Sequence, residues 1–401
     1  MNNTDNRSAR PRVLVLSPRF PYPVVGGDRL RIFQLCKALS TVADLTLLSL
    51  CESPEEMSMT VPTDGVFQRV ERVYLSPWRS RLNVLMALPS RTPLQVAYYR
   101  SREFAQRIGE LLPSHDLVLA HLIRTGDYVR GAALPRILEM TDAISLNYQR
   151  VQSVSSSHRD LRSFVYAIEA RRLLAYERQI IGEFDRAVLV SEVDRQHLLQ
   201  GLDDPRVLVC SNGVDLEHLS FKERAPAEPV VVFIGNMTTV QNMDACMFFA
   251  AEVLPLMRTY HPFRFRVIGR IDSKGKAALE RFEGVEVRAN VGSISQAVEG
   301  AYAGVAPMRL GAGIQNKVLE YMALGLPAVV SSVGLEGLKA VPGRDLLVAS
   351  EAAEMSQVLM SLWHNPAKRL AISRAGRRYV ESTHVWEAML RPVLDEVRQL
   401  S

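Results

Sequence analysis

Cysteine is scarce in this sequence. The 401 residues include only four cysteines, at positions 36, 51, 210 and 246. No two of them form a Cys-x-x-Cys pair, and no histidine stands at metal-ligand spacing from them, so neither a structural zinc site nor a disulfide framework is indicated. Few thiols in a long chain are typical of proteins from a reducing compartment.

Long apolar runs are also absent. No stretch approaches about 18 uninterrupted apolar residues, the length that spans a bilayer. Residues 1–12 are polar and lack the apolar centre of a secretion signal. We therefore expect a cytoplasmic protein, whose contact with a membrane would be peripheral and at its inner face.

A strong charge of one sign is missing as well. Lys and Arg number 48 and Asp and Glu number 43, so the net charge is +5. This mild excess argues against a nucleic-acid partner, because nucleic-acid binding requires a clustered basic face. It is compatible with an anionic substrate or an anionic membrane surface. The hydrophobic fraction of 47% is ordinary for a globular protein and argues against disorder.

The sequence does contain a repeated order of short apolar strands and amphipathic helices. Residues 12–17 predict a strand, 29–39 a helix with one apolar face, and 44–50 the next strand. Strand, helix and strand in this order are typical of a parallel α/β unit. After a polar stretch with two prolines at 216–229, the pattern restarts with an apolar strand at 230–235.

These patterns predict an α/β fold with two Rossmann-like domains. We place the N-terminal domain at residues 1–215 and the C-terminal domain at 216–384. Ligands of open α/β sheets bind beyond the carboxyl ends of the strands. With two such domains facing each other, we expect the site in the interdomain cleft.

The first candidate motif, Gly26-Gly27, lies in the loop after the first strand. Glycines between a strand and a helix let backbone amides approach a phosphate, and the start of the helix adds partial positive charge. A plain tight turn would use the same glycines. The motif is not Gly-x-Gly-x-x-Gly, so a dinucleotide site of the Rossmann type is poorly supported.

The second candidate motif is GAGIQNKVLEYMALGLPAVVSS, residues 311–332. Gly311 and Gly313 can present amides at the start of a helix, and Lys317 offers a point charge to a diphosphate. Glu320 follows three residues later on the same helix face, where its carboxylate can accept two hydrogen bonds from a ribose diol. The alternative is an ordinary Lys–Glu pair on a helix surface. Against it, Glu320 stands among apolar residues, where burying an unpartnered carboxylate is costly.

This segment resembles the donor-binding segment of GT-B glycosyltransferases, especially of the retaining family 4 type. Tyr321 replaces the usual Ala of the family's LEAMA-G-PVV pattern, and Ala312 stands where the family's Glu-x7-Glu pattern has its first Glu. The GxGIQNKVLE form is similar to a subgroup of bacterial sugar transferases associated with exopolysaccharide systems. The matching residues are Leu319, Glu320, Met322, Ala323, Gly325, Pro327, Val329, Val330, Gly334, Glu336, Gly337, Leu338 and Gly343 to Asp345, with further likeness at 191–192 and 211–215.

The resemblance implies a GT-B architecture and transfer of a hexose from a nucleotide-diphosphate sugar to a glycan or lipid-linked acceptor. It further implies retention of configuration and a role in bacterial exopolysaccharide or cell-surface polysaccharide biosynthesis. The donor would sit mostly on the C-terminal domain, and the last helix, 385–401, would cross back onto the N-terminal domain. The implied donor-binding residues are Gly26, Gly27, Gly311, Gly313, Ile314, Asn316, Lys317 and Glu320.

His121, at the end of the predicted strand 117–121, is a catalytic candidate together with Lys317 and Glu320. In relatives of the family, a histidine at the end of an N-terminal-domain strand faces the donor sugar. A partly buried structural histidine is an equal alternative. Asp28 and Asp142 are candidates for contact with the sugar or the acceptor, and Asp142 would otherwise cap a helix.

We expect neither a metal nor a cofactor. The sequence has no His-Glu-x-x-His, no convincing Asp-x-Asp and no Cys/His cluster. Positive side chains and helix dipoles would then stabilise the leaving diphosphate. The leaving phosphate would assist the acceptor hydroxyl, since no strong side-chain base is evident.

Residues 78–104 are the candidate for peripheral contact with a membrane. They include the apolar residues Trp78, Leu85 and Met86 and the basic residues Arg79 and Arg81. An ordinary surface helix is the alternative.

Three other functions remain open. A nucleotide-sugar epimerase on the same fold would need paired acid and base residues in the cleft, and no clear pair is present. A non-catalytic nucleotide-sugar-binding protein is favoured by Ala312 in place of Glu. A dinucleotide oxidoreductase is disfavoured because the Gly-x-Gly-x-x-Gly motif is missing.

Overall fold

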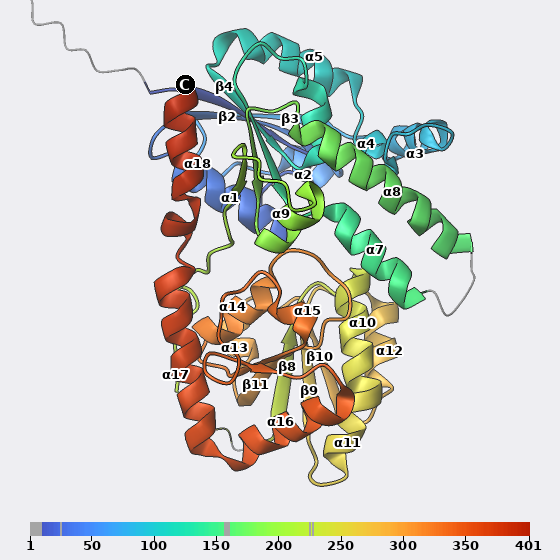
Figure 1. Cartoon of the computed structure of the whole chain (residues 1–401), viewed down its shortest axis with the longest axis vertical. Helices are drawn as coiled ribbons and strands as arrows, with labels where there is room; N and C mark the ends of the chain where they lie inside the picture. Colours follow the sequence, from blue (N-terminus) through green and yellow to red (C-terminus); the bar gives the residue numbers. More distant parts are fainter. Residues whose placement is uncertain (1–9, 25, 156–160, 224–225, 227) are drawn as a thin grey trace, which may run out of the picture.

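Two parallel β-sheets, each with helices packed against it, lie one above the other in the view of Figure 1. The computed structural model describes residues 10–24, 26–155, 161–223, 226 and 228–401. The predicted α/β fold with two Rossmann-like domains is confirmed. No helix in this described part of the chain is both long and apolar enough to cross a membrane.

The N-terminal sheet has seven parallel strands in the order β3-β2-β1-β4-β5-β6-β7. The direction of winding reverses between β1 and β4, which pair with each other, so their carboxyl ends flank the crevice where ligands of such sheets bind. The strands are β1 Arg12–Ser17, β2 Asp44–Cys51, β3 Arg69–Tyr74, β4 Leu117–His121, β5 Arg136–Thr141, β6 Arg186–Leu189 and β7 Val207–Val209.

Both faces of this sheet are buried, which explains its nearly continuous apolar strands. In β1, Val13 and Val15 belong to one buried cluster, and Leu14 and Leu16 belong to a second cluster on the other face. The helices of this domain are α1 Gly27–Leu39, α2 Pro54–Ser58, α3 Pro77–Ala87, α4 Leu94–Tyr98, α5 Arg102–Leu111, α6 Ile123–Gly126, α7 Ile144–Ser155, α8 Leu161–Ile181 and α9 Glu192–Leu199, with short 3-10 turns at Leu112–Ser114 and Asp127–Val129.

The C-terminal sheet has six parallel strands in the order β10-β9-β8-β11-β12-β13. Its winding reverses between β8 and β11, so the second crevice opens at their carboxyl ends. The strands are β8 Val230–Ile234, β9 Arg264–Gly269, β10 Val285–Ala289, β11 Ala301–Ala306, β12 Ala328–Val330 and β13 Leu347–Val348. The helices are α10 Val240–Phe248, a π-helical turn Phe249–Val253, α11 Leu254–Arg258, α12 Ser273–Glu280, α13 Ile294–Ala297, α14 Asn316–Ala323, α15 Ser332–Leu335, α16 Ala352–His364 and α17 Pro366–Thr383.

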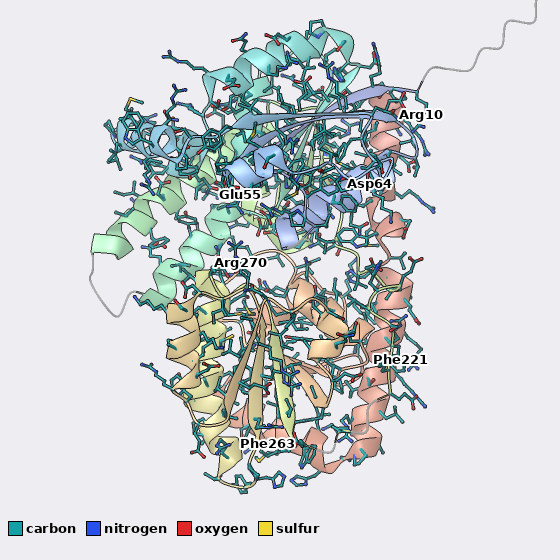
Figure 2. The ribbon with its side chains drawn as sticks, turned by 180° about the vertical axis from the view of Figure 1, so that it is seen from behind. Arg10, Glu55, Asp64, Phe221, Phe263 and Arg270 are labelled. Carbon is teal, nitrogen blue, oxygen red and sulfur yellow. The ribbon has the colours of Figure 1, made fainter. Side chains whose placement is uncertain are left out.

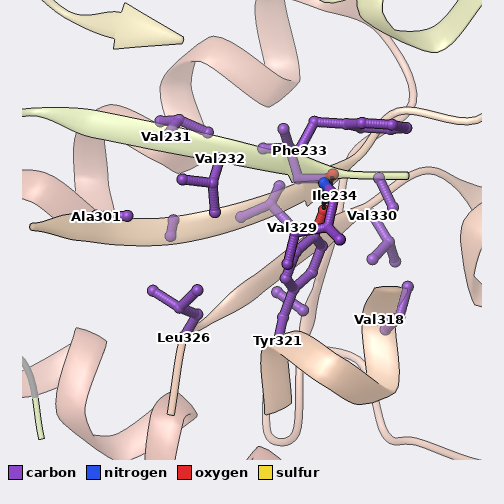
Figure 3. Packing of buried hydrophobic residues seen from close by; sticks show 14 of the residues in the cluster. Val231, Val232, Phe233, Ile234, Ala301, Val318, Tyr321, Leu326, Val329 and Val330 are labelled. Atoms are coloured by element: carbon purple, nitrogen blue, oxygen red, sulfur yellow. Dashed lines mark hydrogen bonds between the residues drawn. The ribbon is translucent and has the colours of Figure 1, made fainter. Parts of the chain in front are cut away.

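Helix α14 is fixed against this second crevice by Tyr321 (Figure 3). The Tyr321 hydroxyl accepts the N–H of Ile234 at 2.9 Å and donates to the carbonyl of Val305 at 3.0 Å, so it joins β8 and β11. A side chain at Gly304 would overlap the Tyr321 ring. The glycine in β11 therefore makes room for the residue that holds α14 in place.

The last helix, α18 Trp386–Leu400, packs on the N-terminal domain (Figure 1). Trp386, Leu390 and Val393 belong to the same buried cluster as Val13 and Val15. Where the chain passes between the domains, the N–H of Val214 donates to the carbonyl of His384 at 2.8 Å. The two domains are thus joined by two hydrogen-bonded segments of chain.

Candidate active site

The amino-terminal ends of two helices meet where the domains face each other. Helix α1 begins at Gly27, after Gly26 with its φ of 98°, and helix α14 begins at Asn316. A Cβ atom on Gly27 would lie 3.5 Å from Nδ2 of Asn316. Helix amino-termini carry unpaired N–H groups and partial positive charge, so two of them facing each other favour an anionic group.

Lys317 is the second residue of α14 and is buried. Its Nζ donates to Oε1 of Gln315 at 2.9 Å and lies 5.3 Å from the centre of the Phe233 ring, but it forms no ion pair with any described residue. Burial lowers the pKa of Lys317 to about 8, and the negative charge of Glu320 opposes that shift. A buried ammonium without a carboxylate partner is costly, and an anionic ligand would offset that cost.

Glu320 lies one helical turn further along and is half-buried. Within the described residues its carboxylate forms no hydrogen bond and no ion pair. Burial raises the pKa of Glu320, while the charge of Lys317 opposes this. The two side chains are therefore not the ordinary surface ion pair that was the alternative, and the carboxylate can accept hydrogen bonds from a ligand.

The glycine-rich loop before α14 rests on the N-terminal domain. A Cβ atom on Gly313, which has a φ of 65°, would lie 3.1 Å from Cβ of Asp142, and the N–H of Gly313 bonds to Asp194. Ile314 is buried, and a Cβ on Gly337 would lie 2.8 Å from it. In this arrangement the amide of Gly313 is directed at a carboxylate, where the sequence pattern had predicted a diphosphate. Donor contact by Gly313 and Ile314 stays a prediction.

Arg150 of α7, which the sequence analysis missed, holds the same loop from the other side. Its guanidinium donates to the carbonyl of Gly311 and pairs with Glu336 at 2.5 Å. Arg150 and Glu336 are separated by 186 positions, so no local pattern in the sequence brings them together. The loop is therefore fixed by a cation from the opposite domain.

His121 stands at the carboxyl end of β4, beside the first crevice, and is 2% exposed. Its Nδ1 lies 2.6 Å from Oε2 of Glu139 in the neighbouring strand β5. Burial by itself would raise the pKa of Glu139, but the hydrogen bond from His121 and the charge of Arg31 lower it to about 2. A carboxylate bound to one ring nitrogen fixes the ring orientation and leaves Nε2 for a second partner.

Glu139 links His121 to the start of α14 through Arg31, which is fully buried in α1. Arg31 Nε donates to Glu139 at 3.2 Å, and its Nη1 donates to the carbonyl of Ser211 at 2.9 Å and lies 3.3 Å from Oδ1 of Asn212. Asn212 Nδ2 in turn donates to Oδ1 of Asn316 at 2.8 Å. A continuous polar network thus runs from His121 to the first residue of α14. Sequence reasoning missed it because its members come from distant segments.

Asp28, in the first turn of α1, belongs to a polar cluster on the N-terminal side. Its Oδ2 accepts from Arg19 Nη1 at 3.0 Å, and Arg19 Nε also reaches the hydroxyl of Tyr99 at 3.3 Å. Burial by itself would raise the pKa of Asp28, but Arg19, His121 and Arg124 lower it below its ordinary value. Contact of Asp28 with the sugar or the acceptor stays a prediction.

Asp142 follows β5 and is half-buried between the domains. Burial raises its pKa to about 7, the neighbouring Asp194 adds to the shift, and Arg124 opposes it. At the start of α7 the N–H groups of Ile144 and Ala143 bond to Glu177 and Asp194, at 2.7 and 2.9 Å. These two carboxylates, and not Asp142, occupy the helix start, so the helix-cap alternative for Asp142 is not supported.

Arg270 is a further basic side chain that sequence reasoning missed. It follows β9 directly, is exposed, and lies on the side of the C-terminal domain that faces the N-terminal domain (Figure 2). It forms no ion pair with the residues that the structure describes. The same residues contain no group of three or more His, Cys, Asp and Glu side chains arranged to hold a metal ion.

Comparison with known proteins agrees with this geometry. Residues 228–365, which contain β8 to β13 and α14, match the family described as Glycosyl transferases group 1. Sucrose-phosphate synthase from Thermosynechococcus elongatus superposes with a TM-score of 0.75 at 16% identity, over 98% of this chain and 99% of that chain. HepE from Anabaena, solved in complex with UDP and glucose, gives a TM-score of 0.69 at 12% identity, over 97% and 100%.

The C-terminal domain thus matches a glycosyltransferase family, and the two domains together have the GT-B fold, as the resemblance implied. Among curated proteins, it is similar to an uncharacterized 44.6 kDa protein in the cps region of Klebsiella pneumoniae. The two are 20% identical over 354 residues, which cover 85% of this chain and 88% of that protein.

Proposed function

We propose that the protein transfers a hexose from a nucleotide-diphosphate sugar to a glycan or lipid-linked acceptor, with retention of configuration and without a metal. The observation that carries this proposal is the pair Lys317 and Glu320, which lack ion-pair partners among the described residues, at the start of α14 and opposite the start of α1. A cation and two helix amino-termini suit a diphosphate, and a carboxylate one turn away suits a ribose.

In this proposal the donor nucleotide binds mostly to the C-terminal domain. Its diphosphate lies between the starts of α1 and α14 with Lys317 beside it, and Glu320 accepts the ribose hydroxyls. The exposed Arg270 adds a second cation on the same side of the domain. HepE was solved with UDP-glucose, which supports a uridine nucleotide as the first one to test.

The chemical step uses the leaving diphosphate. As the bond between the anomeric carbon and the phosphate oxygen breaks, negative charge grows on that oxygen, where Lys317 and the helix starts stabilise it. The acceptor hydroxyl attacks from the same face and gives its proton to the departing phosphate oxygen. His121, oriented through Glu139, offers Nε2 to a hydroxyl of the donor sugar.

The acceptor approaches from the N-terminal domain, near Asp28 and Asp142, at the inner face of the membrane. Assembly of a bacterial exopolysaccharide or cell-surface polysaccharide is supported by the relative from a cps region.

The test begins with thermal unfolding and calorimetric titration against UDP, GDP, dTDP, CMP, ADP and their sugar conjugates, in the presence of EDTA. We expect one nucleotide to raise the melting temperature, because a ligand that binds the folded state stabilises it. Lys317→Met should weaken that binding roughly 10- to 150-fold, the usual range for one charged hydrogen-bonding contact. Lys274→Met, at an exposed lysine of α12, is the matched control and should bind like the unmodified protein.

Turnover separates the alternatives. Transfer of the sugar, or slow hydrolysis of the donor, would exclude a non-catalytic binding protein, and an unchanged sugar in the product would exclude an epimerase. Binding of the nucleotide without any turnover would favour the non-catalytic reading that Ala312 raises. Absence of binding by every nucleotide at millimolar concentration would overturn the proposed site.

A further inference from the structure

Helix α3 exposes its large apolar side chains and buries its small ones. Its buried residues are Ser80 and Ala87, whereas Trp78 is 70% exposed, Leu85 61% and Met86 62%. A surface helix of a globular protein normally does the reverse, with the large apolar residues turned to the core. We name the set Trp78, Leu82, Leu85, Met86 and Leu88 the α3 surface.

No other element in the described part of the chain carries so many exposed large hydrophobic side chains. Helix α3 exposes four large hydrophobic side chains, and no other helix or strand there exposes more than one. Single exposed hydrophobic residues are ordinary, but a contiguous set marks an interaction surface.

The charged residues within the chain segment that carries the α3 surface all have one sign. Residues 72–102 contain six arginines and no aspartate or glutamate. Arg79, Arg81 and Arg91 are exposed and take part in no ion pair with described residues. Exposed tryptophan and leucine with free arginines beside them suit the boundary between the headgroups and acyl chains of an anionic bilayer.

The α3 surface lies on the acceptor side of the N-terminal domain. Helix α3 packs on α4, and α4 packs on α6, which directly follows β4 and His121. Tyr99, at the end of α4, donates to Glu52 at 3.1 Å and accepts from Arg19 at the carboxyl edge of the N-terminal sheet. Figure 1 shows α3 on the flank of this domain, away from α16 and α17 of the C-terminal domain.

A cavity of about 480 Å³ opens beside the same helix. Met86 and Ala87 form part of its wall, and its charged side chains include Arg100 and Asp127, which pair with each other at 3.2 Å. Its size is in the range of small-molecule sites, and it gives a lipid headgroup room next to the exposed apolar residues.

We propose that the α3 surface docks the N-terminal domain on an anionic lipid bilayer. Trp78, Leu85 and Met86 enter the interface, and Arg79, Arg81 and Arg91 bind the headgroups. The proposal deepens the proposed function by locating the acceptor side at the membrane. Its test uses no donor or acceptor, so its failure and the failure of the transferase proposal are distinguishable.

The experiment is co-sedimentation of the full chain with vesicles of phosphatidylcholine, with and without phosphatidylglycerol. We expect binding to the anionic vesicles that weakens as salt rises, with a blue shift of the fluorescence of Trp78, the most exposed of the three tryptophans. Arg79→Gln with Arg81→Gln should weaken the partition roughly 30-fold, since each arginine near an anionic surface contributes about fivefold. Leu85→Ser with Met86→Ser should reduce it further.

Matched controls come from other surfaces of the same chain. Leu202→Ser with Tyr260→Ser changes two side chains that are as exposed as Trp78, and Lys274→Gln with Arg391→Gln removes two exposed charges. Both control pairs should bind vesicles like the unmodified chain. Equal loss in controls and α3 variants would overturn the proposal. So would absence of binding to anionic vesicles, or a dimer in size-exclusion chromatography that Leu85→Ser with Met86→Ser dissociates, because the surface would then join two copies of the chain.

Discussion

The edges of the two sheets that face each other across the site differ in how their charged groups are partnered. On the N-terminal side, Glu139 is buried between His121 and Arg31, and each of the three has a hydrogen-bonded partner. On the C-terminal side, Lys317 and Glu320 lie within one helical turn of each other with no ion pair inside the described residues.

This difference shows which half has its charges paired before a ligand arrives, although Nη2 of Arg31 has no hydrogen-bond partner among the described residues. A buried carboxylate held by two donors orients His121 in advance, which is what a contact to the reacting sugar requires. A buried ammonium without a counter-ion destabilises the folded protein when no ligand is bound. An anion that binds beside the ammonium removes this cost. We infer that the N-terminal edge is preorganised and that the C-terminal edge is completed by the donor.

The largest effect should come from breaking the N-terminal network at its centre. Arg31→Met would leave the Glu139 carboxylate buried without its cation, and such a change costs roughly 3–5 kcal/mol of unfolding free energy. Urea denaturation followed by circular dichroism measures it. Arg374→Met, which removes an exposed partner of Glu223, is the control and should cost about 0–1 kcal/mol. Equal costs for the two variants would contradict the central place of Arg31.

The sequence was sufficient to predict those parts of the fold that local patterns encode. Apolar runs at 12–17, 44–50 and 230–235 became β1, β2 and β8 within one residue at most of their ends, because strands buried on both faces are nearly continuously apolar. The glycine-rich motif likewise predicted the position of α14. Its glycines, its Lys–Glu spacing and its apolar face all lie in one contiguous stretch of sequence.

The polar network from His121 to Asn316 and the contacts between the domains could not be predicted from local sequence patterns. Arg31 and Asn212 are 181 positions apart, and a buried arginine looks in sequence like any helix-surface arginine. Gly313 illustrates the same limit: glycine permits a phosphate contact or a close approach of two domains, and only the position of Asp142 distinguishes them. The sequence singled out residues 78–104 as a candidate for membrane contact, but only the structure shows which side chains of α3 are exposed.

A smaller effect, of opposite sign, is expected at the C-terminal edge when the pH is raised. Lys317 has its pKa lowered to about 8, so it is charged at pH 7 and mostly neutral at pH 9. Binding of the donor nucleotide should therefore weaken roughly tenfold between these pH values, as one pKa unit corresponds to a factor of ten. The folded state, by contrast, should gain stability between pH 8 and 10.5, where only the unfolded chain still holds the proton.

Calorimetric titration from pH 7 to pH 9.5 measures the first trend, and urea denaturation over the same range measures the second. Lys317→Met should show neither trend and should be as stable as the unmodified chain or more stable, in contrast to Arg31→Met. A nucleotide affinity that is independent of pH in the unmodified chain would place the diphosphate away from Lys317.

The smallest effect tests Asp142, which lies between the two edges. Burial raises its pKa from 3.8 to about 7, so between these values the folded protein holds a proton that the unfolded chain has lost. Stability should therefore fall as the pH rises through this window, and Asp142→Asn, which cannot ionise, should remove that fall. The stability advantage of the variant should grow from pH 5 to pH 7 and then level off, with a modest size because the half-exposed carboxyl is screened by solvent. Urea denaturation at pH 5, 6, 7 and 8 measures it against Asp116→Asn, a carboxyl whose pKa the partner Arg12 lowers to about 2 and which stays ionised throughout. If the advantage of Asp142→Asn were the same at every pH, Asp142 would be ionised like an ordinary surface carboxylate, and the contact between the domains would not bury it.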